Sequence, residues 1–310
     1  MRVHVLGSAA GGGFPQWNCN CANCRGLRAG TLRAKARTQC SIAVTGNNLG
    51  DNSGDGSREG SKWMLLNASP DLRAQISSFP ELLPKDSARG SSISSVLLTD
   101  AELDHITGLL SLRENEPIQL HCTRRVFEWV FESNPIFGGL IQASRFGWEK
   151  VENRQPTRCR DGLAYEGIFV EGKVPTYVKT AFDSIGSTVG YCIADTSSNS
   201  SMLYVPAIKH ISEELVAVAS RCDCILFDGS FWSDDEMERQ GVGSRTASAM
   251  GHVPIDGPDG SLARLSHLRG RKIYTHVNNT NPILDETSAE RRAVEKAGWE
   301  VAEDGMDFVL

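Results

Sequence analysis

A glycine-rich segment that ends in three closely spaced cysteines constrains this chain most. The apolar, strand-like run at 2–6 leads into consecutive glycines at 11–13 and then into Cys19, Cys21 and Cys24. Glycine adopts backbone angles that other residues resist, so this loop can fold tightly enough to bring the three thiols to one point. Three thiolates supply most of a tetrahedral zinc shell, and a fourth ligand has to come from elsewhere in the chain.

The spacing of these thiols favours zinc over a disulfide. Any one pair would leave the third cysteine over, and cysteines two or three residues apart form strained bridges. Zinc sites rich in thiolate are normally closed to substrate, so we expect a structural zinc. The alternative is that the three cysteines are incidental small hydrophobic residues.

Charge and hydropathy exclude two classes of function. The 310 residues include 32 basic and 38 acidic ones, for a net charge of -6, whereas binding to nucleic acid phosphates needs a basic face. No apolar run is long enough to span a bilayer, and the N-terminus lacks the pattern of a signal peptide. We therefore expect no nucleic-acid partner and no membrane insertion. The six other cysteines lie mostly in apolar stretches, which favours buried free thiols and a cytoplasmic location.

Strand-like and helix-like segments alternate along the whole chain, which predicts an α/β layered architecture. The short apolar runs are typical of strands whose two faces are both covered. We expect one domain over 1–310, an enlarged polar loop at 47–61 between two strands, and a loop-rich region at 151–187. The predicted strands are 3–6, 41–44, 63–67, 95–98, 118–121, 190–194, 202–205, 224–228 and 272–275. The predicted helices are 71–76, 106–112, 123–131, 212–219, 234–240, 261–268 and 288–297.

Potential metal ligands follow three of these strands at the point where each strand ends. Open α/β sheets bind ligands at the carboxyl ends of their strands, so neighbouring ends of this kind can form a mononuclear metal site. Each group also has a plainer interpretation: a helix N-cap for Asp104, a turn residue for Asp228 and a hydrogen-bonded structural group for His276. The groups are Asp100, Glu102, Asp104 and His105 after the strand at 95–98, Asp228 at the end of 224–228, and His276 after 272–275.

In chain order these features resemble the metallo-β-lactamase superfamily. The resemblance implies an αβ/βα sandwich of two mixed sheets flanked by helices. The superfamily's HxHxDH signature falls on residues 100–105, and its later metal positions fall on Asp228 and His276. The thiol loop resembles the structural zinc loop of the phosphodiesterase branch, where a histidine three residues beyond the His276 position completes the zinc shell. Asn279 stands at that position here and is the candidate fourth ligand.

Further blocks of the chain are 7–21, 67–71, 98–110, 234–237 with 241–243, 250–252 and 276–286. These blocks resemble one family of that superfamily, which acts in the biosynthesis of pyrroloquinoline quinone (PQQ). This resemblance implies a cytoplasmic step that makes PQQ from a crosslinked Glu–Tyr precursor. The step is either an iron(II)- and oxygen-dependent hydroxylation of the tyrosine ring or the carriage of PQQ or its precursor toward the periplasm. The partners implied are the small-molecule precursor and other proteins of the pathway.

Two departures from the superfamily pattern disfavour a dinuclear zinc hydrolase. Asp100 and Glu102 replace the two leading histidines, and no histidine occurs between His121 and His210. Such hydrolases hold two metals in imidazole-rich shells. Two imidazoles, from residues 105 and 276, and one carboxylate remain, a set that suits non-haem iron(II). That carboxylate is Asp104, with Asp228 as the alternative. An inactive hydrolase that serves as a scaffold is a third hypothesis, which the intact ligand set argues against.

Other polar residues are candidates for contact with the substrate. His252 titrates near neutral pH and is a candidate acid or base, although a histidine that fixes its loop is an equal alternative. Asp100 is a second candidate catalytic residue. A substrate with several carboxylates needs cations or amides, and the candidates to bind PQQ or its precursor are Ser69, Arg73, Asn278 and Asn281.

Overall fold

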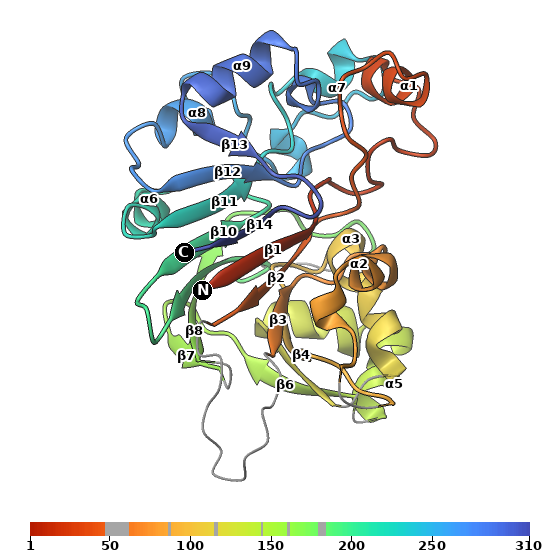
Figure 1. The fold of residues 1–310 in the computed structure, drawn as a ribbon, viewed down its shortest axis with the longest axis vertical. Helices are drawn as coiled ribbons and strands as arrows, with labels where there is room; N and C mark the ends of the chain where they lie inside the picture. The colour runs from red at the N-terminus through yellow and green to blue at the C-terminus, as the bar shows by residue number, and fades with distance from the viewer. Residues whose placement is uncertain (47–61, 86–87, 115–116, 144, 160–161, 179–183) are drawn as a thin grey trace.

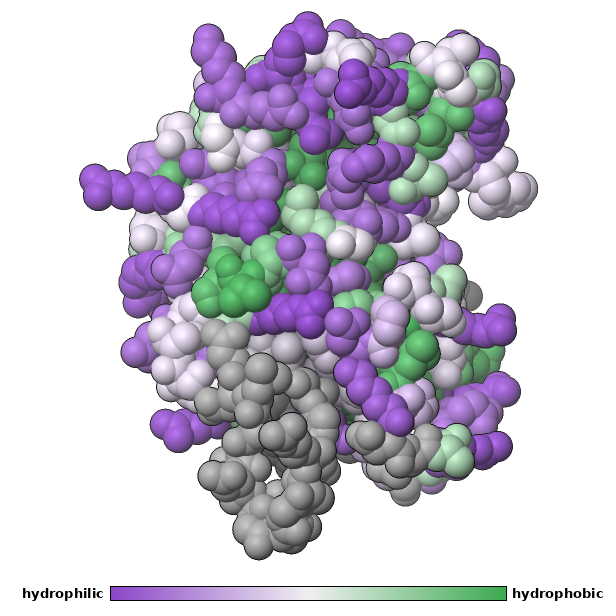
Figure 2. Space-filling model, in the orientation of Figure 1, coloured by the Kyte–Doolittle hydropathy of each residue, from purple (hydrophilic) through white to green (hydrophobic). Residues whose placement is uncertain are grey.

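Two seven-stranded β-sheets face each other and carry helices on their outer surfaces (Figure 1). The computed structural model describes all residues except 47–61, 86–87, 115–116, 144, 160–161 and 179–183. The polar loop predicted at 47–61 lies outside the described residues. Figure 2 shows hydrophilic side chains over most of one face of the molecule, with apolar ones scattered among them.

Both sheets mix parallel and antiparallel pairs. In spatial order the first sheet contains β14 (Asp307–Val309), β1 (Arg2–Gly7), β2 (Ser41–Thr45), β3 (Trp63–Leu66), β4 (Ile93–Leu97), β5 (Ile118–Cys122) and β6 (Phe146–Lys150). The second contains β13 (Trp299–Val301), β12 (Arg271–Thr275), β11 (Cys224–Asp228), β10 (Ser201–Val205), β9 (Thr188–Asp195), β8 (Leu163–Val170) and β7 (Pro156–Arg158).

The helices are short. They are α1 (Ala22–Arg28), α2 (Leu72–Ser78), α3 (Leu103–Ile106), α4 (Arg124–Phe127), α5 (Pro135–Gln142), α6 (Glu213–Ala219), α7 (Glu236–Arg239), α8 (Ser261–Arg264) and α9 (Ala289–Lys296). In the part of the chain that the structure describes, every helix is too short or too polar to cross a membrane.

Three layers of apolar side chains hold the sheets and helices together. Met64, Tyr191 and Leu226 belong to the layer between the sheets and are fully buried. Leu72 of α2 belongs to the layer outside the first sheet, and Leu215 of α6 to the layer outside the second. Complete burial of one such side chain stabilises the fold by about 1.5–3 kcal/mol. The predicted αβ/βα sandwich of two mixed sheets is confirmed.

Every predicted strand is present, but five further strands were not predicted: β6, β7, β8, β13 and β14. The expectation of a loop-rich region at 151–187 is wrong in part, because β7 and β8 lie within it. Strand β8 pairs along its whole length with β9, from Leu163 opposite Asp195 to Val170 opposite Thr188. Residues 163–170 form a strand because they pair with β9, and not because they form a strong apolar run.

The fold brings the loops after β1, β4, β11 and β12 together. Asp228 of β11 lies opposite Thr275 of β12, so the carboxyl ends of these parallel strands are neighbours. The loop after β1 joins the loop after β12, since the N–H of Ala10 donates to the carbonyl of Val277 at 3.0 Å. The two sheets therefore meet at this edge, where the candidate ligands lie.

Candidate metal centre

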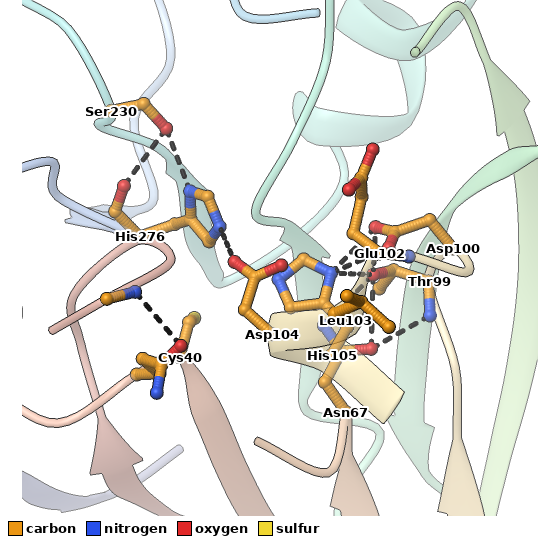
Figure 3. Close-up of polar contacts among 12 residues, drawn as sticks. Cys40, Asn67, Thr99, Asp100, Glu102, Leu103, Asp104, His105, Ser230 and His276 are labelled. Atoms are coloured by element: carbon orange, nitrogen blue, oxygen red, sulfur yellow. Dashed lines mark hydrogen bonds and ion pairs between the residues drawn. The ribbon is translucent and has the colours of Figure 1, made fainter. Parts of the chain in front are cut away.

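The turn that follows β4 is fixed by a hydrogen-bonded asparagine. Asn67, with a positive φ of 63°, accepts the N–H of Thr99 at 2.9 Å and donates from Nδ2 to Thr99 Oγ1 at 2.9 Å. Asparagine tolerates this left-handed backbone better than most residues. The turn leads into α3, and Asp100 points toward His105 while Asp104 points toward His276 (Figure 3).

His105 presents one bound and one free ring nitrogen. Its Nδ1 lies 2.8 Å from both carboxylate oxygens of Asp100. Its Nε2 is buried and has no hydrogen-bond partner among the described residues. Buried polar atoms normally find a partner, and metal-binding histidines characteristically use one ring nitrogen for the metal and the other for a carboxylate. His105 therefore has the surroundings of a metal ligand.

His276 lies on the opposite side of the same point. It follows β12 with a positive φ of 56°, and its Nδ1 lies 2.8 Å from Ser230 Oγ. Its Nε2 lies 3.3 Å from Asp104 Oδ2 (Figure 3). One ligand atom from each of Asp104, His105 and His276 lies within 4.8 Å of the others, which is within reach of a single ion.

Asp228, His252 and His276 form a second group of potential ligands, also within 4.8 Å of one another. Asp228 is fully buried: its Oδ2 accepts the N–H of Ile208 at 3.0 Å and lies 2.8 Å from His252 Nδ1. Its Oδ1 accepts the Ser230 hydroxyl at 2.6 Å. Because both oxygens already contact protein groups, we interpret Asp228 as the residue that orients His252.

The negative charges of the site favour a cation. Burial opposes the charge of His105, but Asp100 and Asp104 outweigh it and raise the pKa of His105 to about 9. Burial also opposes the charge of Asp104, but the neighbouring imidazoles, His105 first, lower its pKa below the usual range. Carboxylates that remain charged when buried fit a bound dication.

Asp100 and Glu102 do not belong to the group of ligand atoms. Asp100 accepts hydrogen bonds from Thr99 Oγ1 and from the N–H of Glu102, in addition to its contact with His105. Glu102 pairs with Lys173 Nζ at 3.2 Å. Burial raises the pKa of Glu102, so this carboxyl group is less ready to carry charge. The structure thus places these two residues behind and beside the ligands, although the signature alignment put them at metal positions.

A cavity of about 280 Å³ opens above this group. Its wall includes His252. Burial alone would lower the pKa of His252, but the Asp228 carboxylate outweighs burial and raises this pKa. Asn278 also lines the cavity, as do Lys173 and Arg245, which sequence reasoning missed because neither lies in a recognisable motif. One signal was present in the sequence: a glycine, Gly251, precedes His252, and its lack of a Cβ lets the backbone pass close to Lys173.

Three of the residues expected to bind substrate do not line this cavity. Ser69 is fully buried and donates to Gln75 Oε1 at 2.9 Å. Arg73 is exposed on α2. Asn281 is buried and donates to the carbonyl of Gly229 at 2.9 Å, so it holds two loops together. Of the four candidates, the structure brings only Asn278 to the cavity.

The three thiols meet at a separate point, with Asn279 beside them. One sulfur from each cysteine lies within 4.8 Å of the others. Asn279 Nδ2 lies 3.1, 3.5 and 3.3 Å from the sulfurs of Cys19, Cys21 and Cys24. Burial, with the neighbouring thiols, raises the pKa of Cys21 to about 12, so this sulfur needs a nearby cation to become a thiolate. A half-turn of the Asn279 amide would bring its oxygen to the same point as a fourth ligand.

We expect Asp100→Asn to weaken metal binding without unfolding the protein. The substitution preserves shape but replaces one of the two oxygens at His105 Nδ1 with an N–H donor. Loss of such a supporting carboxylate typically lowers metal affinity about 10- to 100-fold. Competition with a chelator measures this affinity, and thermal unfolding checks the fold. An unchanged affinity would show that Asp100 does not orient His105.

Glu236 supports the loop that follows His276 and makes stability depend on pH. This buried carboxyl group, at the start of α7, accepts the N–H of Trp232 at 2.6 Å and the hydroxyl of Thr280 at 2.5 Å. Burial outweighs these hydrogen bonds and raises the pKa of Glu236 to about 7. Since the folded state holds this proton more tightly than the unfolded chain, the free energy of unfolding falls as pH rises from about 4.5 to about 7.

Glu236→Gln is therefore expected to be more stable than the unsubstituted chain at pH 8, and this gain should be much smaller at pH 5. The gain over the unsubstituted chain is on the order of 2–3 kcal/mol above the folded pKa and vanishes below the unfolded one. Urea unfolding across this pH range measures the difference. Glu238→Gln, on the exposed side of the same helix, is the matched control, and its difference in stability from the unsubstituted chain should stay constant over this pH range.

Comparisons with known proteins agree with this geometry. The family model of the beta-lactamase superfamily domain matches residues 62–277. The chain is 40% identical to the coenzyme PQQ synthesis protein B of Nitrosococcus oceani, and 43% identical to that of Pseudomonas putida strain F1. Both matches cover 100% of this chain and 100% of the relative.

Solved structures extend the comparison. A crystal structure of Zn(2+)-bound PqqB from Methylobacterium extorquens has a TM-score of 0.90 and 40% identity, and covers 100% of both chains. A diphosphatase from the PhnP family has a TM-score of 0.64 and 17% identity, over 100% of this chain and 97% of that one. At that identity the second likeness concerns the fold alone.

Proposed function

The chain belongs to the family of coenzyme PQQ synthesis protein B within the beta-lactamase superfamily, and on this premise we propose that it catalyses a metal-dependent step of PQQ biosynthesis. The step is hydroxylation of the tyrosine ring of a crosslinked Glu–Tyr precursor, with iron(II) and O2. The observation that carries the proposal is the buried Nε2 of His105, which has no hydrogen-bond partner among the described residues and lies beside His276 and Asp104 at one cavity.

The donor set supports iron over a pair of zinc ions. Two imidazoles and one carboxylate with open positions are typical of non-haem iron(II), which when bound supplies the redox chemistry that activates O2. Asp104, His105 and His276 would hold this ion. The other carboxylates are engaged elsewhere, Asp100 by His105 and Asp228 by His252, and the second group of potential ligands, Asp228, His252 and His276, shares its His276 with the first.

His252 is proposed to exchange a proton with the phenol of the ligand. Its Nδ1 is held by Asp228 at 2.8 Å, which leaves Nε2 for the cavity that it lines. The Asp228 carboxylate stabilises the protonated ring, because it lies in contact with it and is fully buried. A positioned histidine of this kind contributes about 10²- to 10⁴-fold to rate.

The thiol group is proposed to hold a structural zinc with Asn279 as the fourth ligand. The three cysteines precede or begin α1, and Asn279 lies three residues beyond His276. A zinc at this point would connect the loop after β1 to the loop after β12. It would thereby brace the backbone that carries His276.

Oxygen uptake by protein purified without oxygen tests the proposed reaction. The assay contains iron(II), the crosslinked Glu–Tyr compound and ascorbate as the two-electron reductant. One oxygen atom of O2 enters the ring, and the other leaves as water. With ¹⁸O-labelled O2, the label should appear in the hydroxylated ring.

The other functions give different results in the same assay. A hydrolase would take oxygen from water and consume no O2. A carrier would bind PQQ or the precursor without turnover, and its binding would survive chelation of the metal. Either result would remove the hydroxylase assignment.

A further inference from the structure

Two cationic side chains line the same cavity as the metal group but come from separate segments. Lys173 lies between β8 and β9, and Arg245 lies between α7 and the short helical turn at 248–250. Neither residue contacts the imidazoles in any hydrogen bond or ion pair within the described residues. Their positions therefore call for an explanation other than support of the metal.

Arg245 has no counter-charge within the described part of the protein. Its side chain is exposed, and none of the described carboxylates comes within 4.0 Å of its guanidinium. The acidic groups of the cavity have partners already: Asp104 faces His276, and Glu102 faces Lys173. An unpaired guanidinium beside an open cavity is suited to an anion from outside.

Lys173 is held at the cavity by its backbone and by its side chain. A Cβ on Gly251 would lie 2.7 Å from Lys173 Cβ and 3.1 Å from Lys173 N, so only a glycine next to His252 permits this approach. Its Nζ contacts Glu102 at 3.2 Å. An ammonium group has three N–H donors, which leaves donors for a ligand.

We propose that Arg245 and Lys173 bind a carboxylate of the ligand and so orient its ring toward Asp104, His105 and His276. The planar guanidinium matches a carboxylate through two parallel hydrogen bonds, and the ammonium adds a third donor. This inference rests on the proposed function for the identity of the ligand, but binding alone tests it. A phosphate offers similar acceptor chemistry, so the experiment separates the two anions.

Calorimetric titration without oxygen measures binding of the crosslinked Glu–Tyr compound and of its methyl ester. Arg245→Gln should weaken binding of the free acid about 10- to 100-fold, the usual effect of losing a charge-assisted hydrogen bond. The unsubstituted protein should lose a similar factor for the ester. In Arg245→Gln, esterification of the ligand should not weaken binding further, because esterification and the substitution remove the same interaction. Lys173→Gln should weaken binding of the acid by a smaller factor.

Arg269→Gln, an exposed arginine that does not line the cavity, is the matched control and should bind the acid normally. Equal binding of the acid by Arg245→Gln and the unsubstituted protein would overturn the proposal. Failure of the unsubstituted protein to bind the acid, or equally strong competition by inorganic phosphate, would also overturn it. If the unsubstituted protein binds the acid, Arg245→Gln binds it more weakly and no turnover occurs, the hydroxylation is refuted and the carboxylate site is supported.

Discussion

His276→Asn is expected to abolish binding of the proposed iron at the cavity, while the zinc proposed at the three thiols remains. The imidazole Nε2 is one of the three proposed ligand atoms, and the shorter asparagine cannot reach its position. Asparagine is preferred to alanine here because it tolerates the positive φ of 56° at this residue. Since loss of a supporting residue alone costs about 10- to 100-fold in metal affinity, loss of a ligand should cost at least about 100-fold.

Metal analysis of protein purified without oxygen, together with oxygen uptake, measures this effect. His105→Ala should give the same loss, because it removes the buried Nε2, which has no hydrogen-bond partner in the part of the chain that the structure describes. His267→Asn, an exposed histidine outside the cavity, should retain iron and activity. Full activity of either site variant with iron(II) and O2 would contradict the proposed ligand set.

Cys24→Ala is expected to prevent binding of the proposed structural zinc and to destabilise the whole protein. The Cys24 thiol is fully buried and lies 3.3 Å from the Asn279 amide, so its removal opens the shell. Alanine suits α1, so the helix itself should not suffer. Loss of a few kcal/mol of metal-linked stability should lower Tm by on the order of 10 °C. Metal analysis and calorimetry measure the two effects.

Cys159→Ala, at a partly buried thiol outside the group, is the control and should retain zinc. Asn279→His should strengthen zinc binding, because imidazole nitrogen is a better zinc ligand than an amide oxygen. Chelation of the zinc should lower the Tm of the unsubstituted protein to that of Cys24→Ala. Equal stability of the two proteins in the absence of chelator would show that the thiols have no structural role.

The strands of the core could be predicted because their signal is local. All five residues of β11 are buried, and the sequence there is a continuous apolar run that ends in Asp228. Strand β8 carried no such signal, because half of its residues are only partly buried and its pairing with β9 defines it. Helix α1 was also missed, because the usual residue types that begin a helix are absent at its N-cap position. Its N-cap is the sulfur of Cys21, which accepts the N–H of Cys24, and thiols are unusual in that role.

By itself the sequence determined the superfamily, the layered α/β fold and the residue types at the strand ends, since these depend on neighbours along the chain. Only the tertiary structure decided the role of each residue. It placed Asp100 behind His105 and Asn279 beside the thiols, turned Ser69 and Asn281 into the interior, and brought Arg245 to the cavity. These contacts mostly join residues far apart in the chain, and the packing of the two sheets determines such distances.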